Sequence, residues 1–129
     1  MNLNRQTERQ KLGAKGERLA ENFLISKGHR ILFRNYRHGK SELDLISRTD
    51  EVIVISEVKS FYADPLGAAE FRIHKHKQKK IIEGAYGFLG EHPEFEGLGV
   101  RFDVLIVDFS EYPARITHYE GAFYDEEGY

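Results

Sequence analysis

The chain has 129 residues and a net charge of −2, with 40% hydrophobic and 31% charged residues, which indicates one globular domain, 1–129, and excludes a disordered chain. It contains no cysteine, so disulfides and thiolate metal sites are excluded. The polar N-terminus has no apolar run for a signal peptide, and no stretch reaches the roughly 20 apolar residues of a membrane span, so we expect a cytoplasmic protein with no membrane partner.

The first half of the chain predicts one helix followed by three strands. In residues 6–28 the apolar side chains recur at helical spacing, Thr7 and Gln10 stand at capping-box spacing, and Gly28 suits the C-terminal end of the helix. Strands are expected at 30–35, 42–47 and 52–60. A basic connection at 36–40 joins the first two strands, and R-T-D-E at 48–51 forms the turn between the second and third.

The second half predicts a helix and two further strands. Pro65 and Gly67 break the chain, and a long basic helix is expected over 68–89, although its Gly84 and Gly87 each cost a helix about 1 kcal/mol relative to alanine. A loop at 91–99, a buried strand at 100–109 and an edge strand at 114–119 follow. The acidic tail from about residue 120 is expected to be mobile. A three-stranded meander, a helix and a returning strand indicate an α/β class with a mixed sheet.

Charged residues interrupt the two most apolar strands of the first half. Side chains alternate along a strand, so Glu42 and Asp44 share one face, and Glu57 and Lys59 share one face. With the even-numbered turn 48–51, opposite residues have numbers that sum to 99, which places Glu42 opposite Glu57. We therefore predict all four side chains on one face, within about 5–8 Å of one another; an odd-numbered turn would separate the two pairs.

Three carboxylates so close together repel one another unless a cation lies between them. Mg²⁺ accepts one or two carboxylates and leaves positions for phosphate oxygens, and a lysine on the same face can contact the phosphate or the attacking water. The pattern therefore favours metal-assisted hydrolysis of a phosphodiester. The alternative is that these charges only protect an exposed strand edge from aggregation.

Five separated motifs carry a resemblance to a known family. They are G-A-K-G-E-R-L-A at 13–20, N-Y-R at 35–37, S-E-L-D-L-I at 41–46, S-E-V-K at 56–59 and R-F-D-V at 101–104. In this order they resemble the YraN-like uncharacterised protein family, which is predicted to belong to the restriction-endonuclease-like, or PD-(D/E)xK, superfamily and to be similar to archaeal Holliday-junction resolvases. The resemblance covers nearly all of residues 10–108.

The resemblance implies a three-layer α/β/α restriction-endonuclease-like fold with an αβββαβ core and a mixed central sheet. It implies Asp44 and Glu57 as ligands of Mg²⁺ or Mn²⁺, with the backbone carbonyl of Val58 as a third. It implies Lys59 as the catalytic lysine and Glu17 as a helix-borne acid, and we expect Glu42 to assist. Glu17 also fits a plain boundary position beside the apolar stripe of its helix. Ser41 and Phe61 depart from the glycine and arginine usual in the family, and Phe61 removes a phosphate contact.

The charge distribution can present a basic face to a nucleic-acid partner, or it can reflect only an acidic tail. Residues 1–80 carry a balance of +7 and residues 81–129 a balance of −9, which together give the net charge of −2. The basic residues best placed to bind a phosphate backbone are Arg34, Arg37, Lys40 and Lys77. The run H-K-H-K-Q-K-K at 74–80 is equally consistent with a solvated helix face. Asp103, inside the buried strand, is as consistent with a structural partner of Arg101 or a nearby amide as with a catalytic role.

Two hypotheses remain open on the sequence alone. The first is a Mg²⁺-dependent endonuclease-like protein that acts on DNA, including branched DNA, as a homodimer. The second is a non-catalytic nucleic-acid-binding or assembly protein that retains the nuclease fold.

Overall fold

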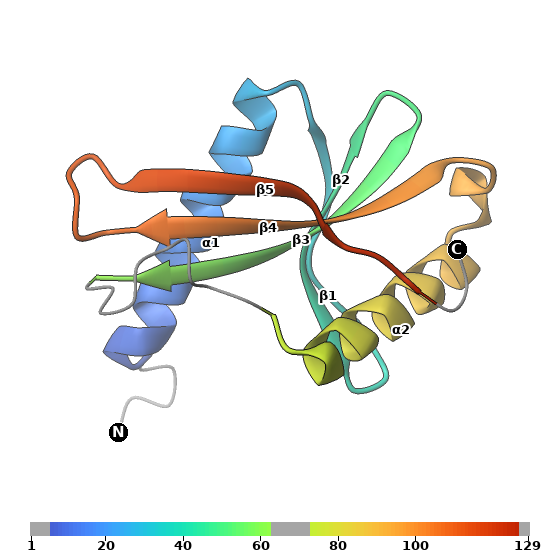
Figure 1. Cartoon of the computed structure of the whole chain (residues 1–129), viewed down its shortest axis with the longest axis horizontal. Helices are drawn as coiled ribbons and strands as arrows, with labels where there is room; N and C mark the ends of the chain where they lie inside the picture. Colours follow the sequence, from blue (N-terminus) through green and yellow to red (C-terminus); the bar gives the residue numbers. More distant parts are fainter. Residues whose placement is uncertain (1–5, 63–72, 127–129) are drawn as a thin grey trace.

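The computed structural model describes residues 6–62 and 73–126 and has the predicted α/β class (Figure 1). In chain order the elements are α1 Glu8–Ser26, β1 Arg30–His38, β2 Ser41–Thr49, β3 Val52–Phe61, α2 Lys75–Glu91, the 3₁₀ helix η2 Pro93–Phe95, β4 Gly99–Asp108 and β5 Arg115–Phe123. The strands form one sheet in the order β1-β2-β3-β4-β5, in which only β3 and β4 are parallel. Within these described ranges no helix is both long and apolar enough to cross a membrane.

The two helices cover opposite faces of the sheet, which gives the three-layer α/β/α architecture (Figure 1). The cluster under α2 includes Ile55, Phe88 and Ile106, and the cluster under α1 includes Leu24 and Leu105. In β4, all residues from 102 to 107 are buried because this strand lies between two neighbours and beneath both helices. The buried strand predicted at 100–109 is therefore confirmed.

The predicted N-terminal cap is observed at α1, whereas the predicted start of α2 is not. The Thr7 side chain accepts a hydrogen bond from the Gln10 amide, and the Gln10 side chain accepts one from the Thr7 amide, which confirms the capping box. The prediction that α2 begins at 68 is wrong for the described part of the range: residues 73 and 74 are not helical, and His74 has extended backbone angles. Residues 68–72 of the prediction lie outside the described residues, as do Pro65 and Gly67.

The chain near residue 120 belongs to the sheet. The mobile tail predicted from about residue 120 is wrong up to Phe123, because β5 continues to that residue and its ring stacks on Phe102 with 5.1 Å between centroids. Glu126 then forms an ion pair with Lys75 of α2, with 2.8 Å between nitrogen and oxygen. Residues 127–129 of the predicted tail lie outside the described residues.

Glycines let both helices approach the sheet closely. A Cβ atom on Gly16 of α1 would lie 1.7 Å from the Ser60 hydroxyl and 2.9 Å from the Ser60 Cβ atom, and one on Gly84 of α2 would lie 3.0 Å from Leu43. Gly84, which weakens the helix on propensity alone, therefore allows the helix to pack against the sheet. The close approach at Gly16 also sets the position of its neighbour Glu17 over β2 and β3.

We expect Gly16→Ala to lower the free energy of unfolding by roughly 1–3 kcal/mol, because the added methyl group overlaps Ser60 and forces α1 away from the sheet. Gly13→Ala is the matched control in the same helix: nothing lies within 4 Å of its Cβ position, so this change should stabilise the protein by about 1 kcal/mol. Urea denaturation of both variants measures the difference. The double variant Gly16→Ala, Ser60→Gly should recover most of the loss; equal losses in the single and double variants would contradict the overlap.

Candidate functional site

The hairpin of β2 and β3 closes more tightly than the sequence predicted. Its turn contains two residues, Asp50 and Glu51, in place of the four expected, and Asp50 adopts a left-handed backbone with φ of 50°. Paired residues have numbers that sum to 101, as in Thr49 with Val52 and Leu45 with Ser56. The predicted register is therefore wrong by two residues. Continued past the last pair, the register sets Asp44, and not Glu42, opposite Glu57.

Asp44 and Glu57 meet where β2 and β3 stop pairing. Beyond Leu45 and Ser56 the regular ladder ends, and the Asp44 carboxylate accepts a hydrogen bond of 2.9 Å from the Val58 N–H. The side chain of Asp44 thus takes the place of a backbone carbonyl between the strands. Asp44 and Glu57 also lie close enough for each carboxyl group to shift the pKa of the other. The structure therefore brings together the two side chains predicted to bind a metal ion.

Glu42 and Glu57 lie on different sides of the sheet. Glu57 faces α2, where the Lys77 ammonium lies 3.5 Å from its carboxylate, whereas Glu42 and Glu17 line a depression of about 570 Å³ beside α1. The prediction that four polar side chains share one face is wrong. The prediction fails because the side chains of β2 change face within the strand. Leu45 packs in the cluster under α1, and Leu43, two residues away, packs in the cluster under α2.

Burial and mutual repulsion raise the pKa of three of these acids. Burial and then the charges of Asp44 and Glu42 raise the pKa of Glu17 to about 7, although a hydrogen bond from Asn35 opposes the shift. Burial and the charge of Asp44 raise the pKa of Glu57 to about 7, although Lys77 opposes it. Burial also raises the pKa of Asp44, against the Val58 hydrogen bond and Lys77. Acids held this close in a partly buried site favour protons or cations.

The donor set fits a hard divalent ion. Asp44 and Glu57 offer carboxylate oxygens, and the ammonium of Lys77 already lies beside Glu57 as a cation. Mg²⁺ is commonly held by one or two carboxylates together with water and phosphate oxygens, so two protein carboxylates suffice. Within residues 6–62 and 73–126, no three or more His, Asp or Glu side chains are grouped as a complete metal site. For Val58, the structure places the amide N–H against Asp44; its carbonyl as a third ligand stays a prediction.

Lys59 lies two residues beyond Glu57 on β3, and its side chain is exposed. It forms no ion pair with any residue in the part of the chain that the structure describes. Among the described residues no carboxylate therefore holds its ammonium group, and its predicted catalytic role stays a prediction.

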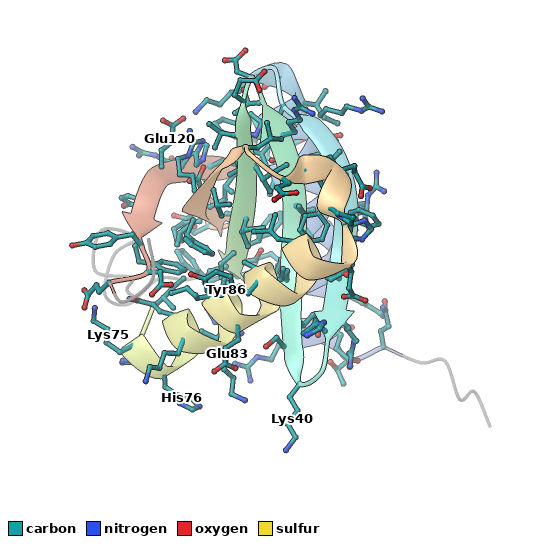
Figure 2. All side chains as sticks on the ribbon, turned by 90° about the vertical axis from the view of Figure 1, so that its right-hand side faces the viewer. Lys40, Lys75, His76, Glu83, Tyr86 and Glu120 are labelled. Carbon is teal, nitrogen blue, oxygen red and sulfur yellow. The ribbon has the colours of Figure 1, made fainter. Side chains whose placement is uncertain are left out.

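Three of the four basic residues predicted to bind nucleic acid are paired with acids. Arg34 pairs with Glu21 of α1, Arg37 lies 3.4 Å from Glu42, and Lys77 pairs with Glu57. Lys40 extends from the tip of the turn between β1 and β2 (Figure 2) and has no ion-pair partner among residues 6–62 and 73–126. A bound phosphate would have to compete with these carboxylates, except at Lys40.

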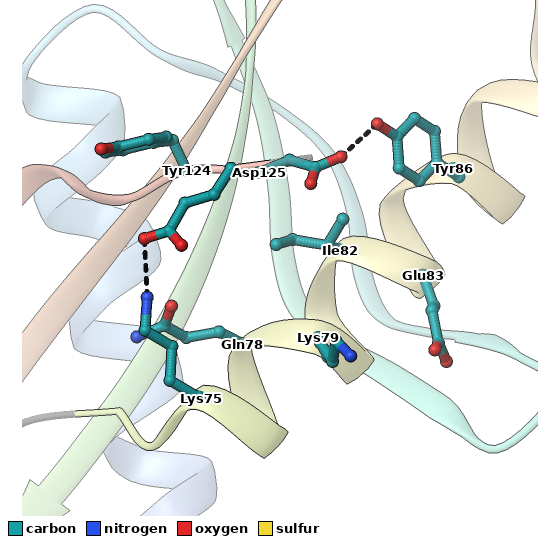
Figure 3. A pocket seen from close by; sticks show the side chains of 9 residues that line it. Lys75, Gln78, Lys79, Ile82, Glu83, Tyr86, Tyr124 and Asp125 are labelled. Atoms are coloured by element: carbon teal, nitrogen blue, oxygen red, sulfur yellow. Dashed lines mark hydrogen bonds and ion pairs between the residues drawn. The ribbon is translucent and has the colours of Figure 1, made fainter. Parts of the chain in front are cut away.

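A second pocket, of about 540 Å³, lies between α2 and the segment that follows β5 (Figure 3). Lys75 pairs with Glu126 and the Tyr86 hydroxyl donates a hydrogen bond to Asp125, so two contacts hold this segment against the helix. None of the residues predicted for catalysis, metal binding or nucleic-acid binding lines this pocket.

Sequence reasoning missed Asn35 as a member of the site. It lines the same depression as Glu17 and Glu42, and its side chain opposes the rise in the pKa of Glu17. The only feature of the sequence that pointed to Asn35 was its place in the motif N-Y-R at 35–37. The alternation of side chains along a strand does not distinguish an exposed asparagine from any other polar residue.

Comparisons with known proteins match most of the chain. The model of the uncharacterised protein family UPF0102 matches residues 16–107. A UPF0102 protein of Chloroherpeton thalassium is 36% identical over 119 residues, covering 91% of this chain and 92% of that protein. One of Treponema pallidum (strain Nichols) is 35% identical over 117 residues, covering 88% and 93%.

A UPF0102 protein of Thermodesulfovibrio yellowstonii is also 35% identical, covering 88% of this chain and 96% of that protein. Among solved structures, Pyrococcus furiosus SfsA in complex with Ca²⁺ is 19% identical with a TM-score of 0.34, covering 87% of this chain and 63% of that one. The family match and the sequence relatives agree along nearly the whole domain and confirm the YraN-like resemblance. The chain therefore belongs to the uncharacterised protein family UPF0102.

Proposed function

We propose that this protein is a metal-dependent endonuclease-like protein that hydrolyses phosphodiester bonds in DNA, including branched DNA, in the cytoplasm. The observation that carries the proposal is the close carboxyl pair of Asp44 and Glu57, in which the Val58 N–H holds Asp44 where β2 and β3 separate, with Lys59 two residues beyond Glu57 on β3. A pair of acids with raised pKa values is costly for the fold, and a purely structural strand pair has no need of it.

Asp44 and Glu57 would hold the metal ion, Mg²⁺ or Mn²⁺. The ion supplies Lewis acidity to the phosphate and lowers the pKa of water. The Val58 N–H fixes the orientation of Asp44, so that its second oxygen stays available for binding. Lys59 would stabilise the charge that develops on the phosphate or move a proton at the attacking water, and Glu17 and Glu42 would assist from the side of α1.

A nucleic-acid backbone would lie along the depression beside α1. Arg18 and Arg34 line this depression together with Glu17 and Glu42. Each phosphate that pairs with an arginine or lysine releases counterions, so binding should weaken linearly on a plot of log affinity against log salt. Arg37 beside this depression and Lys77 on the side of α2 would add contacts by exchanging carboxylates for phosphates, and Lys40 would add a contact directly. A homodimer would present two such sites to a branched substrate.

A non-catalytic nucleic-acid-binding or assembly role is the second candidate. The pairing of Arg34, Arg37 and Lys77 with acids favours it, because these pairs partly neutralise the site in the absence of any ion. In that case nucleic acid would bind without divalent ions and would not be cleaved.

We expect wild-type protein to cleave at least one of linear, flapped or four-way DNA with Mg²⁺ or Mn²⁺, and Lys59→Ala to reduce the rate by about 100-fold or more, because the loss of an acid–base group typically costs that factor. Lys79→Ala removes the same charge from the exposed face of α2 and should leave the rate unchanged. Gel assays with fluorescently labelled DNA and RNA measure both. Binding without cleavage under every condition would favour the second candidate, and equal rates for the two variants would remove Lys59 from the site.

A further inference from the structure

Asn35 lies opposite Asp44 in the pair of β1 and β2. The ladder pairs Arg34 with Leu45 and Tyr36 with Leu43, and between these two pairs Asn35 faces Asp44. In a regular antiparallel pair, residues two apart on one strand point to the same face of the sheet. If the backbone at Asn35 departs from the extended conformation, the direction of the Asp44 side chain should therefore change as well.

Both strands change face at this position. On β2, Leu45 packs in the cluster under α1 and Leu43 in the cluster under α2. On β1, the Arg34 side chain pairs with Glu21 of α1, whereas Tyr36 packs against the rings of Phe88 and Phe33 under α2. Regular alternation would put Tyr36 on the same side as Arg34. The change is shared by the two strands and is confined to Asn35 and Asp44.

The backbone of Asn35 explains the change. It has φ of 49°, the left-handed conformation, and asparagine and glycine adopt this conformation at lower cost than other residues. A left-handed residue inside a strand rotates the chain, and the partner strand follows. As a result the Asp44 side chain points to neither face of the sheet but toward β3, where it accepts the Val58 N–H.

We propose that Asn35 is a positioning residue of this site with two separate functions. Its left-handed backbone turns Asp44 toward β3, and its side-chain amide, in the depression that Glu17 also lines, donates to the carboxylate of Glu17. The effect of these two functions on turnover rests on the proposed nuclease function. The effect of Asn35 on the position of Asp44 is independent of that proposal. Asn35 itself touches neither metal ion nor phosphate in this assignment.

Two variants separate the functions. Asn35→Gly keeps the left-handed backbone and removes the amide, and Asn35→Ala removes both. In hydrogen-exchange NMR of the metal-free protein, the Val58 amide should stay protected in Asn35→Gly and should exchange about tenfold faster in Asn35→Ala, because a left-handed alanine costs 1–2 kcal/mol. The amides of the pairs from Leu45–Ser56 to Thr49–Val52 serve as internal controls and should not change. If Asn35→Ala does not fold, Asn35→Ser replaces it.

The second readout is Mn²⁺-dependent cleavage. Asn35→Gly should lower kcat as much as Glu17→Gln does, with KM for DNA unchanged, and the double variant should be no worse than either, because the amide acts through Glu17. Unchanged Val58 exchange in Asn35→Ala would overturn the backbone function, and wild-type kcat in Asn35→Gly would overturn the amide function. Wild-type protein that cleaves nothing would defeat the proposed nuclease, while the Val58 exchange still decides how Asp44 is positioned.

Discussion

Asp44→Asn should abolish divalent-ion binding and DNA cleavage and should make the ion-free protein more stable at pH 7. Removing a residue that only hydrogen-bonds to a metal ligand typically lowers metal affinity about 10–100-fold. Removing the ligand itself should therefore lower the affinity for Mn²⁺ more than about 100-fold. The asparagine oxygen can still accept the Val58 N–H. The charge that raises the pKa of both Glu17 and Glu57 disappears, which relieves repulsion in the folded state.

The pH dependence of stability tests the same repulsion. Glu17 and Glu57 have folded-state pKa values of about 7, above the ordinary value of 4.5, so the folded protein binds more protons than the unfolded chain between these two values. Their protonated forms stabilise the fold below about pH 4.5, and this contribution is lost as the pH rises to about 7. This loss should be measurable in ion-free wild type, and it should be smaller in Asp44→Asn.

Asp50→Asn is the matched control. Asp50 is exposed in the turn between β2 and β3, and asparagine tolerates its left-handed backbone equally well. Calorimetric titration with Mn²⁺ and thermal melts between pH 4.5 and 8 measure ion binding and stability for both variants. An Asp44→Asn protein that binds Mn²⁺ like wild type, or that melts below it at pH 7, would contradict the acidic-site interpretation.

The strands and the class of fold were predictable because their signals are local. Runs such as V-I-V-I-S at 52–56 and D-V-L-I-V at 103–107 have the β-branched and apolar residues of buried strands, and both lie within observed strands. The start of α2 was misplaced because its first turn, Lys75 to Gln78, is polar and its N-cap, His74, makes no side-chain capping hydrogen bond. The sequence therefore contains no local signal that marks residue 75 as the start of the helix.

The members of the site were predictable, but their arrangement was not. Asp44, Glu57 and Glu17 come together as expected, because strand pairing and the helix contact at Gly16 bring them near one another. Their distribution over two sides of the sheet depends on one left-handed residue, Asn35, in the neighbouring strand. Alternation assumes that every residue of a strand is extended, so it cannot anticipate such a change of face.

Asp103 shows why one prediction stayed open until the structure was known. Each of its carboxylate oxygens accepts two hydrogen bonds. Oδ1 accepts from Arg101 Nε at 2.8 Å and from the Gly121 amide at 3.0 Å. Oδ2 accepts from Arg101 Nη2 at 2.9 Å and from His118 Nε2 at 2.7 Å. Because the Lys27 ammonium donates to His118 Nδ1, the imidazole proton sits on Nε2 and points at Asp103. Two of these partners come from β5, 15 and 18 residues away, where no local pattern reveals them.

We expect Asp103→Asn to lower the free energy of unfolding by about 3–5 kcal/mol, the usual cost of removing one partner of a buried ion pair. Either orientation of the new amide sets its NH₂ group against two donors, and Arg101 loses its carboxylate. Burial alone would raise the pKa of Asp103, yet the hydrogen bonds from His118, Arg101 and Gly121 lower it to about 2. Its stabilisation is therefore complete above the ordinary value of 3.8 and is lost as the pH falls through about 2.

Urea denaturation at pH 7 and at pH 2.5 tests this role. The difference between Asp103→Asn and wild type should shrink by about 1–2 kcal/mol at the lower pH, because the carboxylate of wild type is then partly protonated. Asp108→Asn, on the same strand but only half-buried, weakens the hydrogen bonds from Ser110 and should cost less than about 1.5 kcal/mol. If Asp103→Asn unfolds no more easily than Asp108→Asn while DNA cleavage falls, Asp103 acts in the reaction; a large loss of stability identifies it as the residue that ties β4 to β5.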